Sequence, residues 1–236
     1  MTQPDRDTRA GSGGDDRLPG RPYPPPAHSE PLWPSLACVL VAIGLQLLLP
    51  DRLIARPRWL LPALELVLLI GLSFASPREL EGEHPRRRGL SLALTALVSA
   101  ANIISLALLS HLLLRRGTNN GRQLIDSGAL IWLTNVLIFG LWYWQIDRGG
   151  PGRRAAGRDQ QPDFLFPQMT DDRIQQPNWR PEFIDYLYVS LTNGLALSPT
   201  DTMPLSRAAK SMMGLQSLVS LVTIGLIIAR AVNILQ

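Results

Sequence analysis

Hydroxyl, amide and carboxylate side chains gather at one turn near the C-terminal end of the chain. They stand between two apolar stretches, at Thr192, Asn193, Gly194, Ser198, Thr200 and Asp201. Both stretches are apolar enough to enter a bilayer, where non-helical backbone is tolerated only against protein or a water-filled cavity. The turn is therefore expected to form a buried or aqueous polar site.

A second set of polar residues lies in the apolar stretch 207–235, which follows the turn. Gln216, Ser220 and Thr223 recur at intervals of four and three residues, so they share one face of a helix. This face either lines a wet path or hydrogen-bonds to other helices. We take the three residues as candidates for lining a path.

Glu65 is an acid near the middle of another apolar stretch, residues 59–75. A carboxyl group at that depth is costly, so it is expected to face other helices or a water-filled space. Glu65 is a candidate for a proton relay or an ion site. The alternative is a carboxyl group that simply hydrogen-bonds to a neighbouring helix.

Small polar residues also share one face of the stretch 90–114. They are Thr95, Ser99, Asn102 and Ser105. Small and polar side chains on one face commonly hold membrane helices together. This face is therefore expected to serve packing.

The sequence contains no pattern typical of an enzyme. A Gly-rich phosphate-binding loop, a Gly-x-Ser-x-Gly turn and a spaced pair of acids are all absent. With a single cysteine, Cys38, the chain can form neither an intramolecular disulfide nor a cysteine-based metal site of its own. The histidines lack metal-ligand spacing. We expect no catalysis, no bound metal and no cofactor.

An all-α membrane bundle must hold these residues. A spanning helix needs about 20 residues, and the chain offers about five segments near that length. They cover residues 32–49, 59–75, 90–114, 123–146 and 207–235. Residues 77–89 are expected to form a charged loop, and Thr202–Leu205 to supply a cap and an early proline for the last helix. Residues 183–197 are apolar but too short to span, so they are expected to form a re-entrant half-helix before the last span.

Composition divides the chain into regions. Residues 1–31 are rich in Gly, Pro, Asp and Arg, and cannot bury enough apolar surface to fold, so a disordered tail is expected. Residues 32–122 are expected to form a three-helix membrane region. Residues 123–236 then supply an outer helix, a long loop, the half-helix and an inner helix.

The long connection, residues 147–181, changes character along its length. Its first part, DRGGPGRRAAGRDQQP, is polar and glycine-rich and is expected to be mobile. Apolar side chains follow at Phe164, Leu165, Phe166, Met169, Ile174 and Trp179. Their presence predicts that the second part folds onto the surface of the bundle.

The chain is basic, with a formal net charge of +4 and an isoelectric point near 9.8. Its basic residues gather at the ends of apolar segments, where anchoring in a membrane is the ordinary explanation. The expected partner is thus a lipid bilayer and not nucleic acid. The expected location is the cell membrane, crossed several times.

The sequence DYLYVSLTNGLALSPTDTMPLSRAAK, with the long helix after it, resembles the pore module of potassium-type channels. Residues 187–190 and Thr192 stand where such modules have an aromatic-Ser-x-x-Thr pore helix. Asp201 and residues 204–207 stand where they have an Asp after the filter and a Pro-Leu-Gly-Arg start to the inner helix. The chain resembles still more closely an uncharacterised family of bacterial multi-pass membrane proteins that keeps this outline.

The resemblance covers roughly residues 123–235 and departs from the channels at the filter. The Thr-x-Gly-Tyr-Gly run, whose carbonyl oxygens replace the hydration shell of potassium, is missing, and residues 193–198 read NGLALS. Potassium selectivity is therefore not implied.

Three functional hypotheses follow. The first is a channel-like membrane protein, assembled as a homo-oligomer, in which residues 192–201 form the constriction. The second is a non-conducting structural or interaction protein, in which the turn is a satisfied polar plug. The third is a proton-coupled transporter that uses Glu65.

Overall fold

The structure is a computed structural model, and it describes residues 33–55, 57–74, 85–114, 121–155, 161–170, 179–196 and 201–235. The expected disordered tail, residues 1–31, lies outside these ranges. The helices are α1 (Trp33–Leu47), α2 (Leu60–Phe74), α3 (Pro85–Leu114), α4 (Gly121–Ile146), α5 (Pro151–Ala155), α6 (Phe183–Ala196) and α7 (Arg207–Leu235). Short 3-10 turns lie at Asp51–Leu53, Asp147–Gly149 and Pro167–Met169. The expected all-α class is confirmed.

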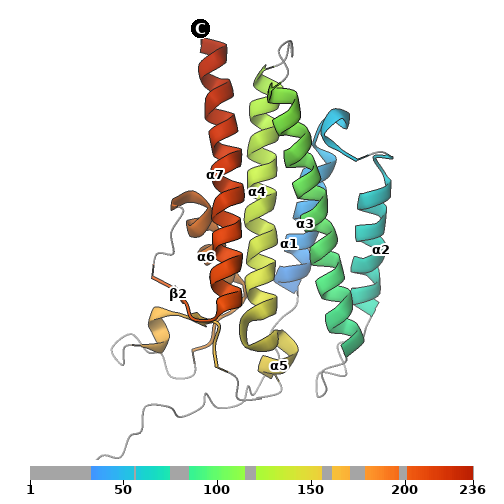
Figure 1. The fold of residues 1–236 in the computed structure, drawn as a ribbon. Helices are drawn as coiled ribbons and strands as arrows, with labels where there is room; N and C mark the ends of the chain where they lie inside the picture. The colour runs from blue at the N-terminus through green and yellow to red at the C-terminus, as the bar shows by residue number, and fades with distance from the viewer. Residues whose placement is uncertain are drawn as a thin grey trace, which may run out of the picture.

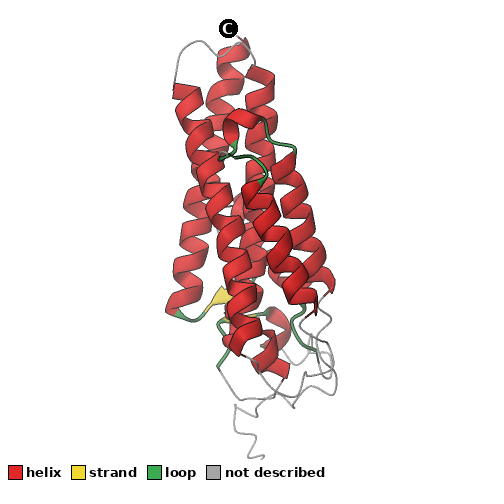
Figure 2. Ribbon diagram, turned by 90° about the vertical axis from the view of Figure 1, so that its right-hand side faces the viewer, coloured by secondary structure: helices red, strands yellow, loops and turns green. Residues whose placement is uncertain are grey.

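Helix α4 is the centre of the bundle. It contacts α1, α3, α6 and α7, whereas α2 packs on α3 and α1. Figure 1 shows α2 on one flank of the bundle and α6 and α7 on the other. Seen from the side, the long helices run together along one axis (Figure 2). Helix α4 therefore joins α1 and α3 to α6 and α7.

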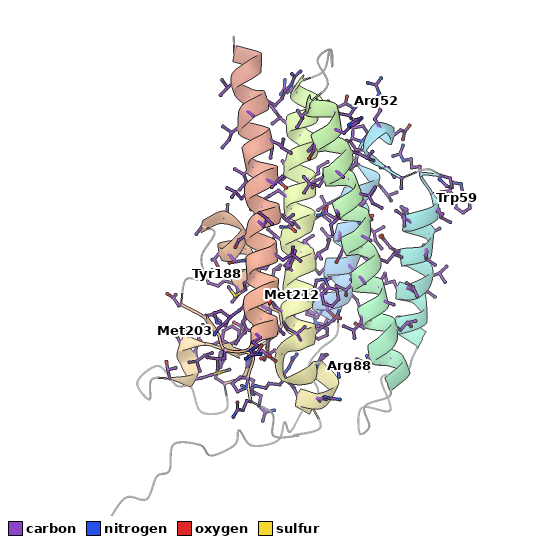
Figure 3. All side chains as sticks on the ribbon, in the orientation of Figure 1. Arg52, Trp59, Arg88, Tyr188, Met203 and Met212 are labelled. Atoms are coloured by element: carbon purple, nitrogen blue, oxygen red, sulfur yellow. The ribbon has the colours of Figure 1, made fainter. Side chains whose placement is uncertain are left out.

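Three helices are long and apolar enough to cross a membrane, within Arg87–Leu113, Gly121–Arg154 and Arg207–Val232 of the described chain. Helices α1 and α2 have only 15 residues each, or about 22 Å at the rise of an α-helix against about 30 Å of hydrocarbon. Of the five expected spans, three are thus supported. Figure 3 shows Arg52 and Trp59 toward one end of the bundle and Arg88 toward the other.

Two predicted boundaries are wrong. Residues 85–89 were expected in a charged loop, but α3 already begins at Pro85, because proline suits a first helical turn and arginine is a good helix former. Thr202–Leu205 were expected to cap and start the last helix, yet Met203 and Pro204 form β2. The cap is Ser206, whose Oγ accepts a hydrogen bond from the Ala209 backbone N at 3.1 Å.

The second part of the long connection packs onto the bundle as predicted. Phe164 and Phe166 are buried in the same apolar cluster as Tyr143 and Tyr186, with Met169 and Trp179 packed against it. The Phe164 ring lies 5.1 Å from the Tyr143 ring, centroid to centroid. Ile174, expected to do the same, lies outside the described residues.

The first part of the connection is more ordered than predicted. Residues 147–149 continue α4 as a 3-10 turn, and residues 151–155 form α5. The expectation of a mobile segment is therefore wrong for residues 147–155. A short antiparallel sheet then pairs Phe164 of β1 (Phe164–Leu165) with Pro204 of β2 (Met203–Pro204).

Candidate functional site

Helix α6 carries the first part of the predicted polar turn. Its N-terminal end is held by Asp185, whose Oδ2 accepts a hydrogen bond from the Glu182 backbone N at 2.7 Å. Near its C-terminal end, Asn193 and Gly194 are buried. The Thr192 hydroxyl donates to backbone carbonyl oxygens of α6 itself. Asp201 is exposed just before β2. Ser198 and Thr200 lie outside the described residues.

Gln216 of α7 is the centre of a buried amide network, and its side chain is 0% exposed. Its Oε1 accepts hydrogen bonds from the Tyr143 hydroxyl at 2.5 Å and from Asn193 Nδ2 at 2.9 Å. Its Nε2 donates to the carbonyl oxygen and the Oγ of Ser190 at 2.8 and 2.7 Å. Both ends of the amide are thus used, and α4, α6 and α7 are joined at one point.

Asn193 extends this network along α7. Its Nδ2 also donates to the Met213 carbonyl oxygen at 3.0 Å, and its Oδ1 accepts from the Ser217 hydroxyl at 3.2 Å. The last turn of α6 is therefore bound to α7 through side chains and backbone together.

The remaining residues of the predicted path-lining face are also buried. Ser220 and Thr223 are both 0% exposed. Asn135 of α4 donates to Ser220 Oγ at 3.2 Å, while Thr223 donates to the Val219 carbonyl of its own helix at 2.8 Å. Of the two alternatives for this face, the structure displays hydrogen bonding to neighbouring helices for Gln216 and Ser220.

Gly194 permits the close contact between α6 and α7. A Cβ atom at this position would lie 3.3 Å from Ser220 Oγ and 3.4 Å from Gln216 Nε2. The Gly194 carbonyl oxygen accepts a hydrogen bond from Trp132 Nε1 of α4 at 3.4 Å. Since Trp132 lies near the middle of α4, the C-terminal end of α6 lies beside the middle of that helix.

A second buried polar cluster lies where α4 ends, and the sequence reasoning missed it. Asp147 is 0% exposed. Its Oδ1 accepts hydrogen bonds from the backbone N of Asp163 at 2.8 Å and of Phe164 at 3.3 Å, and its Oδ2 accepts from the Tyr186 hydroxyl at 2.6 Å. One carboxylate therefore fixes the start of the long connection to α6.

Arg154 of α5 completes this cluster. Its Nη1 donates to the carbonyl oxygens of Trp144 and Asp147, both at 2.8 Å. Its guanidinium carbon lies 5.8 Å from the Trp144 ring centroid and 5.5 Å from that of Tyr186. The Arg154 cation therefore lies over two aromatic rings. The charge that offsets the burial of the Asp147 carboxylate is that of Arg148, whose Nε lies 3.9 Å from Asp147 Oδ2.

The chain reaches this geometry through backbone angles that favour glycine. Arg148, Gly149 and Gly150 have φ values of 50°, 76° and 101°. A Cβ at Gly150 would stand 2.9 Å from the Gln145 carbonyl oxygen. Two glycines directly after a long helix are the signal that could have indicated an ordered reversal here in place of a mobile segment.

Glu65 of α2 lies apart from both clusters. It is 0% exposed, and neither carboxylate oxygen has a hydrogen-bond partner among the described residues.

The polar face predicted on α3 packs against α4. Gln145 Nε2 donates a hydrogen bond to Thr95 Oγ1 at 2.6 Å, and Trp142 Nε1 donates to Ser99 Oγ at 3.0 Å. For Thr95 and Ser99 the expected packing role is confirmed.

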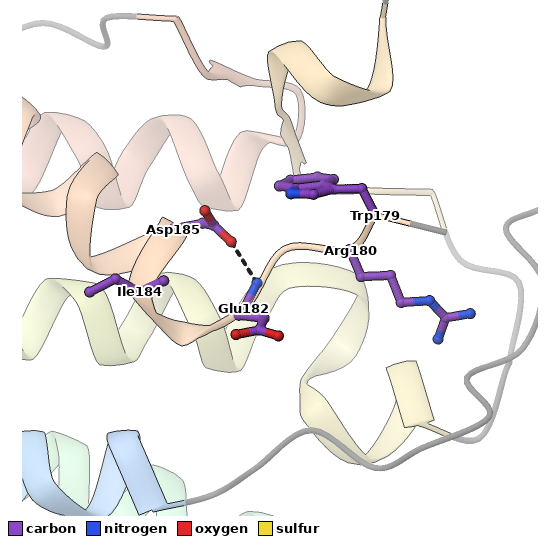
Figure 4. A pocket seen from close by; sticks show the side chains of 5 residues that line it. All are labelled: Trp179, Arg180, Glu182, Ile184 and Asp185. Atoms are coloured by element: carbon purple, nitrogen blue, oxygen red, sulfur yellow. Dashed lines mark hydrogen bonds between the residues drawn. The ribbon is translucent and has the colours of Figure 1, made fainter. Parts of the chain in front are cut away.

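An open pocket of about 430 Å³ lies beside the start of α6 (Figure 4). It is lined by Trp179, Arg180, Glu182, Ile184 and Asp185. Burial raises the pKa of the Asp185 carboxyl above its ordinary value. The pocket contains none of the predicted site residues, and its mixture of charges selects no ligand class.

In the described part of the chain, no group of three or more His, Cys, Asp or Glu side chains could hold a metal ion. Cys38 is a buried free thiol, and its Sγ lies 3.6 Å from the Leu137 carbonyl oxygen.

Comparison with protein-family models, curated proteins and solved structures gave no match. What the fold establishes is an all-α chain with three helices able to cross a membrane.

Proposed function

We propose that this chain is a multi-pass membrane protein whose α4, α6 and α7 form a pore-type hairpin, and that assembled copies of it let cations pass. The observation that carries the proposal is the course of the chain around α6. Tyr186, in the first half of α6, bonds to Asp147 at the end of α4, whereas Gly194 bonds to Trp132 near the middle of α4. The half-helix is thus re-entrant in this proposal.

The return of the chain supports the same hairpin. After α6, β2 pairs with β1, and the Leu205 backbone N donates to the Asp163 carbonyl oxygen at 2.8 Å. Asp163 also bonds to Asp147 through its backbone N. The chain therefore comes back to the end from which α6 started before α7 runs the length of the bundle. An outer helix, a half-helix, a return and an inner helix are the parts of a pore module.

The electrostatics of α6 favour a cation. The helix has 14 residues, about 21 Å in length, and its carbonyl dipoles place partial negative charge at the C-terminal end. That end lies halfway along α4, and the exposed carboxylate of Asp201 follows it in the chain. Since the Thr-x-Gly-Tyr-Gly run is absent, the proposal does not extend to selectivity for potassium.

The amide network has a supporting role in this proposal. Gln216, Ser220 and Thr223 face inward within one protomer, so they can line a path only if α7 moves away from α4. We assign Gln216 and Asn193 to holding the end of α6 at its depth. Thr192 and Asp201, which are less buried, are the better candidates for facing a constriction between copies.

Flux measurements on the full chain in liposomes test the proposal. Potassium, sodium and proton flux should exceed that of protein-free vesicles, and Asp201→Asn should lower cation flux several-fold. Asp51→Asn is the matched control, because Asp51 is an exposed acid at the opposite end of the bundle. Flux equal to that of empty vesicles, or equal losses in both variants, would contradict the proposal.

A specific observation favours a second function, that of a non-conducting structural membrane protein. The Gln216 amide finds all its partners inside one protomer, which is what a polar plug requires. Chemical crosslinking in mild detergent separates the two functions. A symmetric oligomer with cation flux supports the pore, and a monomer without flux supports the plug.

A further inference from the structure

Glu65 and Gln46 face one another between α2 and α1, away from the α4–α6–α7 hairpin. Glu65 is 0% exposed and Gln46 is 6% exposed. The Gln46 side chain lies beside the Glu65 carboxyl group. Among the described residues, however, the two Glu65 carboxylate oxygens have no hydrogen-bond partner, and the Gln46 Nε2 has none either.

No described cation hydrogen-bonds to Glu65. On α3, which packs against α2, the basic side chains that the structure describes are Arg87 and Arg88 near one end and His111 near the other, and none of them donates to a Glu65 oxygen. In the α1–α2 connection, Arg58 bonds to Asp51 and to the Leu47 carbonyl oxygen. Arg52 lies in the exposed 3-10 turn. The titratable group of α1, Cys38, faces Leu137 of α4.

A carboxylate in such surroundings carries a large desolvation penalty, whereas a neutral carboxylic acid does not. The acid also has an O–H that can donate to an amide oxygen, while its carbonyl oxygen can accept from an amide N–H. Gln46 offers both groups on one side chain. A rotation of this side chain would complete a pair that only the protonated acid can form.

We propose that Glu65 and Gln46 form a proton-binding site between α1 and α2. The carboxyl group holds its proton while α1, α2 and α3 are packed together, and it releases the proton when α2 moves away from them. The site couples the pH to the packing of this half of the bundle. It does not depend on whether α4, α6 and α7 conduct ions.

Carbodiimide labelling of the full chain in liposomes tests the site. A protonated carboxylic acid adds across the N=C bond of a carbodiimide: the proton goes to one nitrogen, and the carboxyl oxygen bonds to the carbon. The adduct then rearranges to a stable N-acylurea when the acyl group moves to nitrogen. Apolar dicyclohexylcarbodiimide reaches buried acids, whereas a charged, water-soluble carbodiimide reaches exposed ones, and peptide mass spectrometry locates each label.

We expect dicyclohexylcarbodiimide to label Glu65 and the water-soluble reagent to label the exposed Glu182. As the pH rises, the labelling of Glu65 should persist above the pH at which an ordinary carboxyl group in water loses its proton. The Glu65→Gln variant should lose the label in this peptide. Failure to label Glu65 at any pH, while Glu182 reacts, would overturn the proposal. Protection of Glu65 by sodium chloride at fixed pH would overturn it too, since the ligand would then be a metal cation.

A melting experiment gives a second readout that does not depend on the reagent. If the packed state holds a proton that the unfolded state releases, stability decreases as the pH rises. The melting midpoint of the wild type should therefore fall from mildly acidic to mildly alkaline buffer by several degrees more than that of Glu65→Gln. Equal falls in both proteins would count against a bound proton.

Discussion

Two pairs of buried polar residues on opposite sides of α4 differ in their hydrogen bonding. On the side of α6 and α7, Gln216 and Asp147 are fully buried and have hydrogen-bond partners for both of their terminal atoms. On the side of α1 and α2, Glu65 is also fully buried and Gln46 is 6% exposed, yet both Glu65 oxygens and the Gln46 Nε2 lack such partners among the described residues. A buried polar group that has its hydrogen-bond partners favours one arrangement of the helices. A buried polar group without partners is destabilising, and binding a ligand or a proton can reduce that cost.

Removal of the Asp147 carboxylate should have the largest effect. Asp147→Ala leaves two backbone N–H groups and the Tyr186 hydroxyl without their acceptor, and Arg148 without its counter-charge. The expected loss is about 3–5 kcal/mol of stability, the usual cost of breaking a buried charged cluster. Denaturant titration in mild detergent measures it.

Asp126→Ala is the matched control, because Asp126 is an exposed acid on the same helix. Its loss should be under about 0.5 kcal/mol. Similar losses in both variants would mean that the Asp147 cluster does not hold α6 to α4.

Gln216→Leu should have the next largest effect. The substitution removes one acceptor and one donor group, and with them the hydrogen bonds of Gln216 to Tyr143, Asn193 and Ser190. Hydrogen bonds between membrane helices contribute about 0.6 kcal/mol on average, so the expected loss is about 2 kcal/mol for the set. The same titration measures it, with the exposed Leu218→Ala of α7 as a control that should remain near wild type. An unchanged Gln216→Leu would remove the distinction between the two sides of α4.

Glu65→Leu should have the smallest effect, and the opposite sign. Replacing a buried acid that lacks partners with an apolar side chain of similar volume removes a desolvation cost, so we expect a gain of about 1 kcal/mol. Thermal melting in detergent at alkaline pH, where the gain is largest, checks this prediction. A marked loss of stability would show that Glu65 has partners outside the described residues.

Much of this fold could be predicted from the sequence because apolar runs and their interruptions determine helices locally. The inner helix, Arg207–Leu235, and the end of the fourth helix at Ile146 have the bounds that hydropathy and charge predict. The apolar residues after Asp163 were enough to predict a loop that packs on the bundle. The start of α3 and the strand at Met203 were not predicted, since both depend on preferences that compete within a few residues.

The candidate site likewise has features that the sequence predicts and features that only the tertiary structure shows. Helical spacing places Gln216, Ser220 and Thr223 on one face without reference to any other helix. Whether that face meets water or protein depends on the position of α4 and α6, and only the tertiary structure brings Tyr143, Asn135 and Ser190 to it. The partners of Asp147 also become visible only in the tertiary structure, because they lie 16 to 39 positions away along the chain.

By itself, then, the sequence determined helices long and apolar enough to cross a membrane, the half-length α6 and the residues that share each helical face, because these follow from local composition and periodicity. Only the tertiary structure decided which buried polar groups have partners. That outcome depends on where helices far apart in the chain meet: Gln216 bonds to Asn193 and Tyr143, while the Glu65 oxygens have no hydrogen-bond partner among the described residues.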